Sequence, residues 1–182
     1  MKKTILVVLA VLLSIVLILL PRFYKTNLVN INNQDSIINN ILERKGYDSI
    51  EVVKAKKYYD YYAVIYNPNP KLDNSKENLE LMIYKKTQSF SSNNYEYYGG
   101  ASSTRNFNTF NINEEGNKTT IIVYGDNRSK NAYSYSITNS EITYKKNIKG
   151  DLILDIYIIL DSDNCSSVNE LYDINGKVIE IF

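Results

Sequence analysis

The chain of 182 residues contains no histidine, no tryptophan, one cysteine and three prolines. Without histidine, it cannot use Ser-His-Asp or Cys-His catalysis, bind a metal through imidazole, or switch with pH through an imidazole group. The single cysteine, Cys165, excludes an internal disulfide and a cysteine-cluster metal site. Because no base is close to it in the sequence, we interpret it as an inert thiol. These absences exclude many classes of enzyme and favour a binding role.

The chain also lacks an excess of one charge. It has 21 basic and 20 acidic residues and a net charge of +1. Lys2, Lys3 and Arg22 flank the first apolar run, and without these three the balance is 18 basic to 20 acidic residues, or −2. A domain with this overall balance has no general attraction for nucleic-acid backbones. We therefore expect no nucleic-acid partner.

The longest apolar run extends from Thr4 to Leu20, and in it only Thr4 and Ser14 are polar and no residue is charged. As a helix rising about 1.5 Å per residue, this run covers roughly 25 Å, at the short end of the lengths that span a bilayer. A chain of this size has little material with which to bury such a helix. The run is therefore predicted to be a transmembrane helix inserted in the lipid bilayer.

The flanks of this run favour an uncleaved signal anchor. Residues 17–24 offer no small residues at the spacing that a signal peptidase requires. Lys2 and Lys3 favour an orientation with the short amino-terminal end in the cytoplasm, and Arg22 and Lys25 oppose this orientation weakly. We expect a single-pass protein of the cell membrane, with its amino terminus cytoplasmic and its carboxy-terminal domain outside. A secreted protein from which the segment is removed is the alternative.

One short amphipathic helix is predicted over residues 36–45, because the apolar residues at 37, 38, 41 and 42 share one helical face. Asp35 is the predicted N-cap, and Gly46 ends the helix.

After Gly46 the pattern indicates strands and turns. The predicted strands cover residues 50–57, 61–66, 79–85, 119–124, 132–138, 141–146, 152–160, 170–174 and 177–182. The strand 152–160 is apolar on both faces, which predicts a central position. Asn175 and Gly176 predict a type I′ turn. Residues 87–109 are predicted to be a long mobile loop, apart from short β-like pieces at 95–98 and 107–112.

The expected register of the hairpin formed by 132–138 and 141–146 places Ile137 opposite Ile142 and Tyr135 opposite Tyr144.

The predicted fold class is mainly β (α+β), with an N-terminal transmembrane helix followed by one short amphipathic helix on a mostly antiparallel sheet of hairpins. About seven to nine strands would form this sheet, curling into a sandwich or an open barrel. The expected organisation is a membrane anchor over residues 1–26, a linker over 27–34 and an extracytoplasmic β-rich domain over 35–182.

Paired carboxylates can cleave glycosidic bonds without histidine, so the acidic residues are candidates for catalysis. The candidates are Glu114, Glu115, Asp151 and Asp155. Asp155 stands out because it lies in an apolar strand, where burial would raise its pKa. An exposed sheet face or a structural ion pair is the commoner explanation. No catalytic residue is therefore assigned.

Asp161 and Asp163 alternate as they would at the start of a calcium loop. The glycine and glutamate that such a loop needs at its sixth and twelfth positions are replaced by Ser166 and Tyr172. We interpret the segment as a turn and predict neither a metal nor another cofactor.

Tyrosine is the most distinctive residue present, with 17 copies. Tyr95, Tyr97 and Tyr98 lie beside two glycines, and tyrosine can stack on a sugar or anchor a protein partner. These three residues are the candidate binding surface for an envelope protein or a glycan. Cross-strand packing is the alternative, because tyrosine is a preferred strand residue.

The sequence thus predicts a non-catalytic interaction or accessory module that is anchored in the membrane at the cell envelope. An exported carboxylate-based hydrolase or envelope-modifying enzyme is the alternative.

Overall fold

The computed structural model describes residues 13–16, 28–68, 70, 79–87, 93–102, 107–139, 142–159 and 167–182. Residues 13–16 are helical, and no helix in these ranges is long and apolar enough to cross a membrane. Most of the predicted transmembrane segment and the whole acidic stretch around Asp161 and Asp163 lie outside the described residues. The described part is mostly β with antiparallel sheets, as predicted.

The first sheet, sheet A, carries the helix α2 (Gln34–Lys45) on one face. Its strand order is β1-β5-β4-β3-β2, formed by β1 (Leu28–Asn30), β5 (Asn94–Ser102), β4 (Glu80–Lys86), β3 (Tyr61–Asn67) and β2 (Glu51–Tyr58). The predicted hairpin of β2 and β3 is confirmed, with its turn at Tyr59 and Asp60. Val29 in β1 is buried, so residues from 28 onward of the expected linker belong to the folded domain.

The second sheet, sheet B, has three strands in the order β10-β7-β6. They are β10 (Leu152–Ile159), β7 (Lys118–Asp126) and β6 (Phe107–Glu114). The third sheet, sheet C, has the order β12-β11-β8-β9 and contains β12 (Val178–Ile181), β11 (Ser167–Tyr172), β8 (Ser134–Asn139) and β9 (Ile142–Asn147). Three stacked sheets therefore replace the single sheet that we expected.

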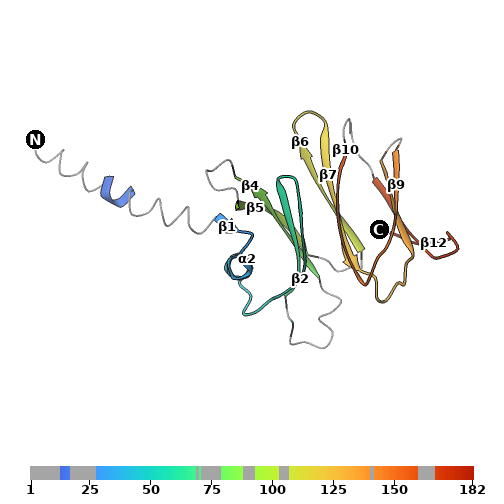
Figure 1. The fold of residues 1–182 in the computed structure, drawn as a ribbon, viewed down its shortest axis with the longest axis horizontal. Coiled ribbons are helices and arrows are strands. Elements are labelled where there is room, and N and C mark those ends of the chain that lie inside the picture. Colours follow the sequence, from blue (N-terminus) through green and yellow to red (C-terminus); the bar gives the residue numbers. More distant parts are fainter. Residues whose placement is uncertain are drawn as a thin grey trace, which may run out of the picture.

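The elements stack in four layers, which run from α2 through sheets A and B to sheet C (Figure 1). Alternate residues of β7 point into different cores: Ile122 and Tyr124 pack toward sheet A, whereas Ile121 and Val123 pack toward sheet C. Sheet B is thus covered on both faces, and this explains why its strands are apolar on both sides.

β10 is apolar on both faces because of this stacking and not because it lies in the middle of a sheet. It pairs with β7 and forms an edge of sheet B, so the predicted central position is wrong. Its two apolar faces arise because Leu154 packs toward sheet A and Ile153 packs toward sheet C.

The ends of α2 are partly as predicted. Gly46 caps the helix with φ of 70°, and its N–H donates to the carbonyl oxygen of Leu42. The N-cap is Asn33 and not Asp35, because the Asn33 side chain accepts from the backbone N–H groups of Asp35 and Ser36. The helix therefore begins at Gln34.

Two hairpins of sheet C differ from the prediction in detail. Ile137 pairs with Tyr144, and Tyr135 pairs with Lys146. This register differs from the expected one by two residues, so the same side chains still share a face.

In the last hairpin Gly176 has a positive φ of 80°, but Asn175 is not among the residues with positive φ. The turn is therefore not type I′, which needs positive φ at both residues. Asp173 fixes it by accepting from the N–H groups of Asn175 and Lys177.

Candidate functional site

The three tyrosines proposed as a binding surface lie in strand β5, which pairs with β4 and β1. The predicted β-like piece at 95–98 is therefore confirmed as part of β5, whereas the predicted mobile loop is wrong for residue 94 and residues 99–102. Tyr95 is fully buried beneath α2, where its ring meets Tyr62 edge-on at 6.2 Å between centroids. The structure thus places Tyr95 in the core rather than on a surface.

Tyr97 and Tyr98 are exposed, but they point to opposite sides of sheet A. The Arg44 guanidinium of α2 lies 4.4 Å from the centre of the Tyr97 ring. Tyr98 meets Tyr61 at 5.8 Å between ring centroids, on the side that faces sheet B. The structure does not bring these two rings together in one platform.

The four candidate acids are also dispersed. Glu114 ends β6 and Glu115 follows it in an exposed turn, whereas Asp151 is exposed just before β10 and Asp155 lies within that strand. Glu114 lies opposite Lys118 of β7, and Asp155 lies opposite Val123 of the same strand. The two positions on β7 are five residues apart, which corresponds to roughly 17 Å along the strand. Paired glycosidase carboxyls lie roughly 5 to 9.5 Å apart, so these two acids do not form such a pair.

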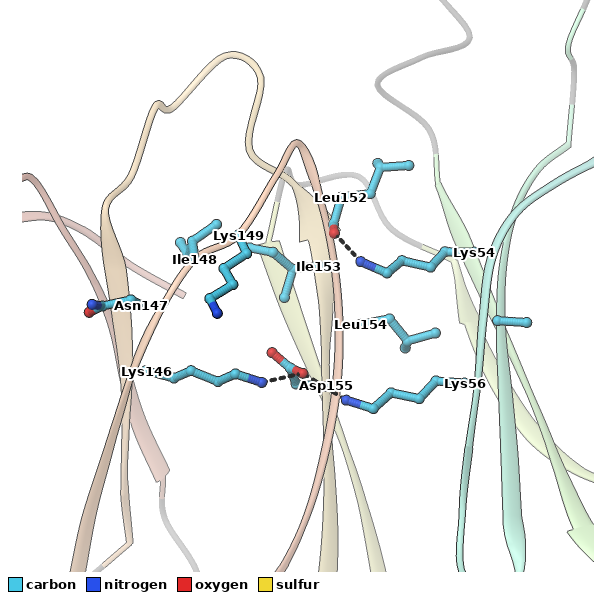
Figure 2. A pocket seen from close by; sticks show the side chains of 11 residues that line it. Lys54, Lys56, Lys146, Asn147, Ile148, Lys149, Leu152, Ile153, Leu154 and Asp155 are labelled. Carbon is cyan, nitrogen blue, oxygen red and sulfur yellow. Dashed lines mark hydrogen bonds and ion pairs between the residues drawn. The ribbon is translucent and has the colours of Figure 1, made fainter.

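A pocket of about 270 Å³ lies where the three sheets meet (Figure 2). Sheet A contributes Lys54 and Lys56 of β2, and sheet B contributes Asp155 of β10. Lys146 of β9 and Lys149 of the following turn complete the charged lining. We name these five residues the lysine pocket and consider it the candidate functional site.

Asp155 joins the three sheets at the floor of the lysine pocket. Its Oδ1 atom lies 2.9 Å from Lys56 Nζ and 2.6 Å from Lys146 Nζ. Its Oδ2 atom accepts a hydrogen bond of 2.8 Å from the hydroxyl of Tyr135 in β8. Tyr135 in turn contacts the hydroxyl of Tyr157.

These contacts determine the protonation of Asp155. Burial by itself would raise the pKa of the carboxyl, but the hydrogen bonds from Lys146, Lys56 and Tyr135 outweigh it and lower the pKa below its usual value. The expectation of a raised pKa is therefore wrong. At neutral pH Asp155 is an ionised carboxylate and has no proton to donate as a general acid.

Tyr135 remains a neutral hydroxyl. Burial, its hydrogen bond with Tyr157 and the charge of Asp155 all raise the pKa of Tyr135 well above its usual value. The hydroxyl therefore serves as a donor that fixes the Asp155 carboxylate.

The other two lysines of the pocket are not in the ion pairs that Asp155 forms with Lys56 and Lys146. Lys54 Nζ donates to the carbonyl oxygen of Leu152 at 2.5 Å, and Lys149 is exposed at the rim. Four lysines against one carboxylate give the lining a net charge of +3, although most of the chain outside the apolar run is slightly acidic. This arrangement can hold an anion.

The four lysines were not predicted as site residues from the sequence. Lys54 and Lys56 alternate along one strand, which places them on one face, and this signal was available. The sequence gives no sign that these lysines converge with Asp155, because Lys56 and Asp155 are 99 positions apart in the chain.

Comparison with known proteins gives no family for this chain. No family model, curated protein or solved structure matches it. Within the described ranges there is no group of three or more Cys, Asp or Glu residues that could hold a metal ion.

Proposed function

We propose that the chain is a non-catalytic binding module, held at the outer face of the cell membrane by residues 4–20, and that the lysine pocket is its ligand-binding site. The observation that carries the proposal is the charge of the pocket, in which four lysines accompany one carboxylate and two of them, Lys56 and Lys146, help to keep it ionised. Such a site attracts an anionic group and has no acid ready to protonate a leaving group.

The position of the anchor supports a role close to the bilayer. Seven residues separate Leu20 from Leu28, where β1 begins. Fully extended, they reach at most roughly 25 Å. The domain therefore remains near the lipid surface, where an anionic lipid, polymer or protein of the envelope is within reach.

The anchor is tested by fractionating cells that express the full chain. We expect the chain in the membrane pellet after an alkaline carbonate wash, with its original amino terminus on sequencing, and its domain digested by protease added to intact spheroplasts. In a matched variant, Leu9→Arg with Leu13→Arg, each charge opposes insertion by about 3 kcal/mol, and the chain should leave the pellet.

A wild-type chain in the soluble fraction, or one whose mature amino terminus begins after residue 20, would contradict the anchor. A domain that resists protease in intact spheroplasts but is digested after lysis would contradict the orientation.

A further inference from the structure

The lysine pocket contains more hydrogen-bond donors than its own acceptors use. Each ammonium group has three N–H donors. Lys54 gives one to Leu152, and Lys56 and Lys146 each give one to the same oxygen atom of Asp155. Figure 2 shows Lys54 and Lys56 extending from one side toward the space beside β10 and Lys146 extending toward it from the other, whereas the Lys149 side chain turns toward Lys146 and away from Leu152. A ligand in that space would meet donors from several directions.

We infer that the lysine pocket binds a phosphate group, with Lys54 and Lys149 as its principal ligands and Lys56 and Lys146 as supporting charges. This inference rests on the proposed function and names the chemical class of its ligand.

The arrangement of the cations favours phosphate over carboxylate. A planar carboxylate is best matched by the fork of an arginine, whereas lysine acts as a point charge. Here point charges approach from β2 on one side and from β9 and the following turn on the other (Figure 2). A tetrahedral group presents oxygens in several directions at once and can meet both sides. The net charge of +3 also suits a group that carries one or two negative charges.

Lys54 and Lys149 are the residues to change, because neither is paired with Asp155 in the ion pairs of the described residues. Replacing them removes positive charge and leaves the ion pairs of Asp155 in place.

Lys57 is the matched control. It lies on the same strand as Lys54, but its ammonium lies near the ring of Tyr95 on the α2 side of sheet A.

The first experiment titrates the full chain in neutral-detergent micelles with glycerol 3-phosphate and, separately, with acetate, at constant ionic strength, by isothermal calorimetry. We expect saturable binding of glycerol 3-phosphate and much weaker binding of acetate. Lys54→Gln and Lys149→Gln should each weaken the phosphate ester by about tenfold, because each removes a hydrogen bond to a charged group. Lys57→Gln should leave its affinity within twofold, and unchanged thermal unfolding would show that the variants fold.

The outcomes separate this inference from the proposed function. If acetate binds as tightly as the phosphate ester and both depend on Lys54, the pocket is a general anion site, and the inference of phosphate is wrong while the binding module stands. If neither anion binds, or if Lys57→Gln weakens binding as much as Lys54→Gln, both proposals are contradicted.

The second experiment distinguishes a lipid headgroup from a soluble phosphate. The full chain is placed in nanodiscs of phosphatidylcholine alone or with phosphatidylglycerol, and glycerol 3-phosphate is titrated again. If the headgroup is the ligand, phosphatidylglycerol should compete and weaken the apparent affinity of the soluble ester. Equal affinities in the two nanodiscs would assign the pocket to a soluble or polymeric phosphate.

Discussion

One arrangement recurs among individual residues. A buried or half-buried carboxylate accepts a hydrogen bond from a tyrosine hydroxyl and also forms an ion pair with a lysine. Glu80 accepts from Tyr66 at 2.6 Å and Glu114 from Tyr61 at 2.6 Å, and Asp155 follows the same pattern with Tyr135. The lysine partners are Lys45 for Glu80, Lys118 for Glu114, and Lys56 and Lys146 for Asp155. Burial opposes the charge in all three, yet each pKa is lowered by these hydrogen bonds. The acids thus act as ionised connectors between elements.

The first prediction concerns the hydroxyl of Tyr66, a fully buried residue on the α2 side of sheet A. Tyr66→Phe removes a hydrogen bond to the ionised Glu80 and should lower the free energy of unfolding by about 2 kcal/mol. Tyr84→Phe is the control, since Tyr84 is equally buried on the same side but donates to the neutral Asn40 at 3.3 Å. It should cost less than about 1 kcal/mol. Urea unfolding measures both, and equal losses would contradict the account.

The second prediction concerns pH. The pKa of Asp155 is lowered in the folded state, so its ion pairs stabilise the fold fully above the unfolded-state pKa of about 3.9, and this stability is lost as pH falls through the folded-state pKa. Asp155→Asn cannot ionise. The difference in unfolding free energy between wild type and this variant should therefore be constant above about pH 5 and shrink toward pH 2. A difference that grows on acidification would mean that Asp155 is not held ionised.

At the element scale, the sequence predicted those features that depend on neighbouring residues. Gly46 ends α2 as expected, and the hairpin of β2 and β3 is correct. The errors arise where two local signals compete or where a partner is distant. Asn33 and Asp35 are both good caps, and only the geometry selects Asn33. β5 has little periodicity because Gly99 and Gly100 fit closely against other segments, where a Cβ at Gly100 would lie 2.5 Å from the carbonyl oxygen of Leu81.

The third prediction tests the start of α2. Asn33→Ala should lower the free energy of unfolding by about 1 kcal/mol, because two backbone N–H groups lose their acceptor. Asp35→Ala, which removes only a first-turn charge, should cost a few tenths of a kcal/mol. The comparison uses thermal or urea unfolding of the two variants. A larger loss for Asp35→Ala would show that the cap predicted from the sequence is the correct one.

At the scale of the whole molecule, stacking of three sheets determines which surfaces remain available. Sheet B is covered on both faces, whereas β12 lies at an open edge, with Ile179 and Ile181 exposed. The same stacking creates the lysine pocket, because β2, β9 and β10 come from three different sheets. Asp155 could be singled out from the sequence as an acid in an apolar strand. Its lysine partners could not, because no local pattern specifies which sheets stack.

The fourth prediction follows from this layering. Native-state hydrogen exchange of the full chain should be slowest in β7, which is buried along nearly its whole length between two other sheets. It should be fastest among the strands in β12, which is mostly exposed at the edge of sheet C. Mass spectrometry of exchanged peptides gives the order. Protection of β12 equal to that of β7 would mean that the edge of sheet C is covered in solution.

Binding of a phosphate group in the lysine pocket can be tested by the acetylation of individual lysines. The full chain is treated with an acetylating reagent with and without glycerol 3-phosphate, and modification of each lysine is quantified by mass spectrometry. We expect slower acetylation of Lys54 and Lys149 when the phosphate ester is present, with Lys57 and Lys177 unchanged. Protection that is equal at all four lysines, or absent from Lys54 and Lys149, would contradict it.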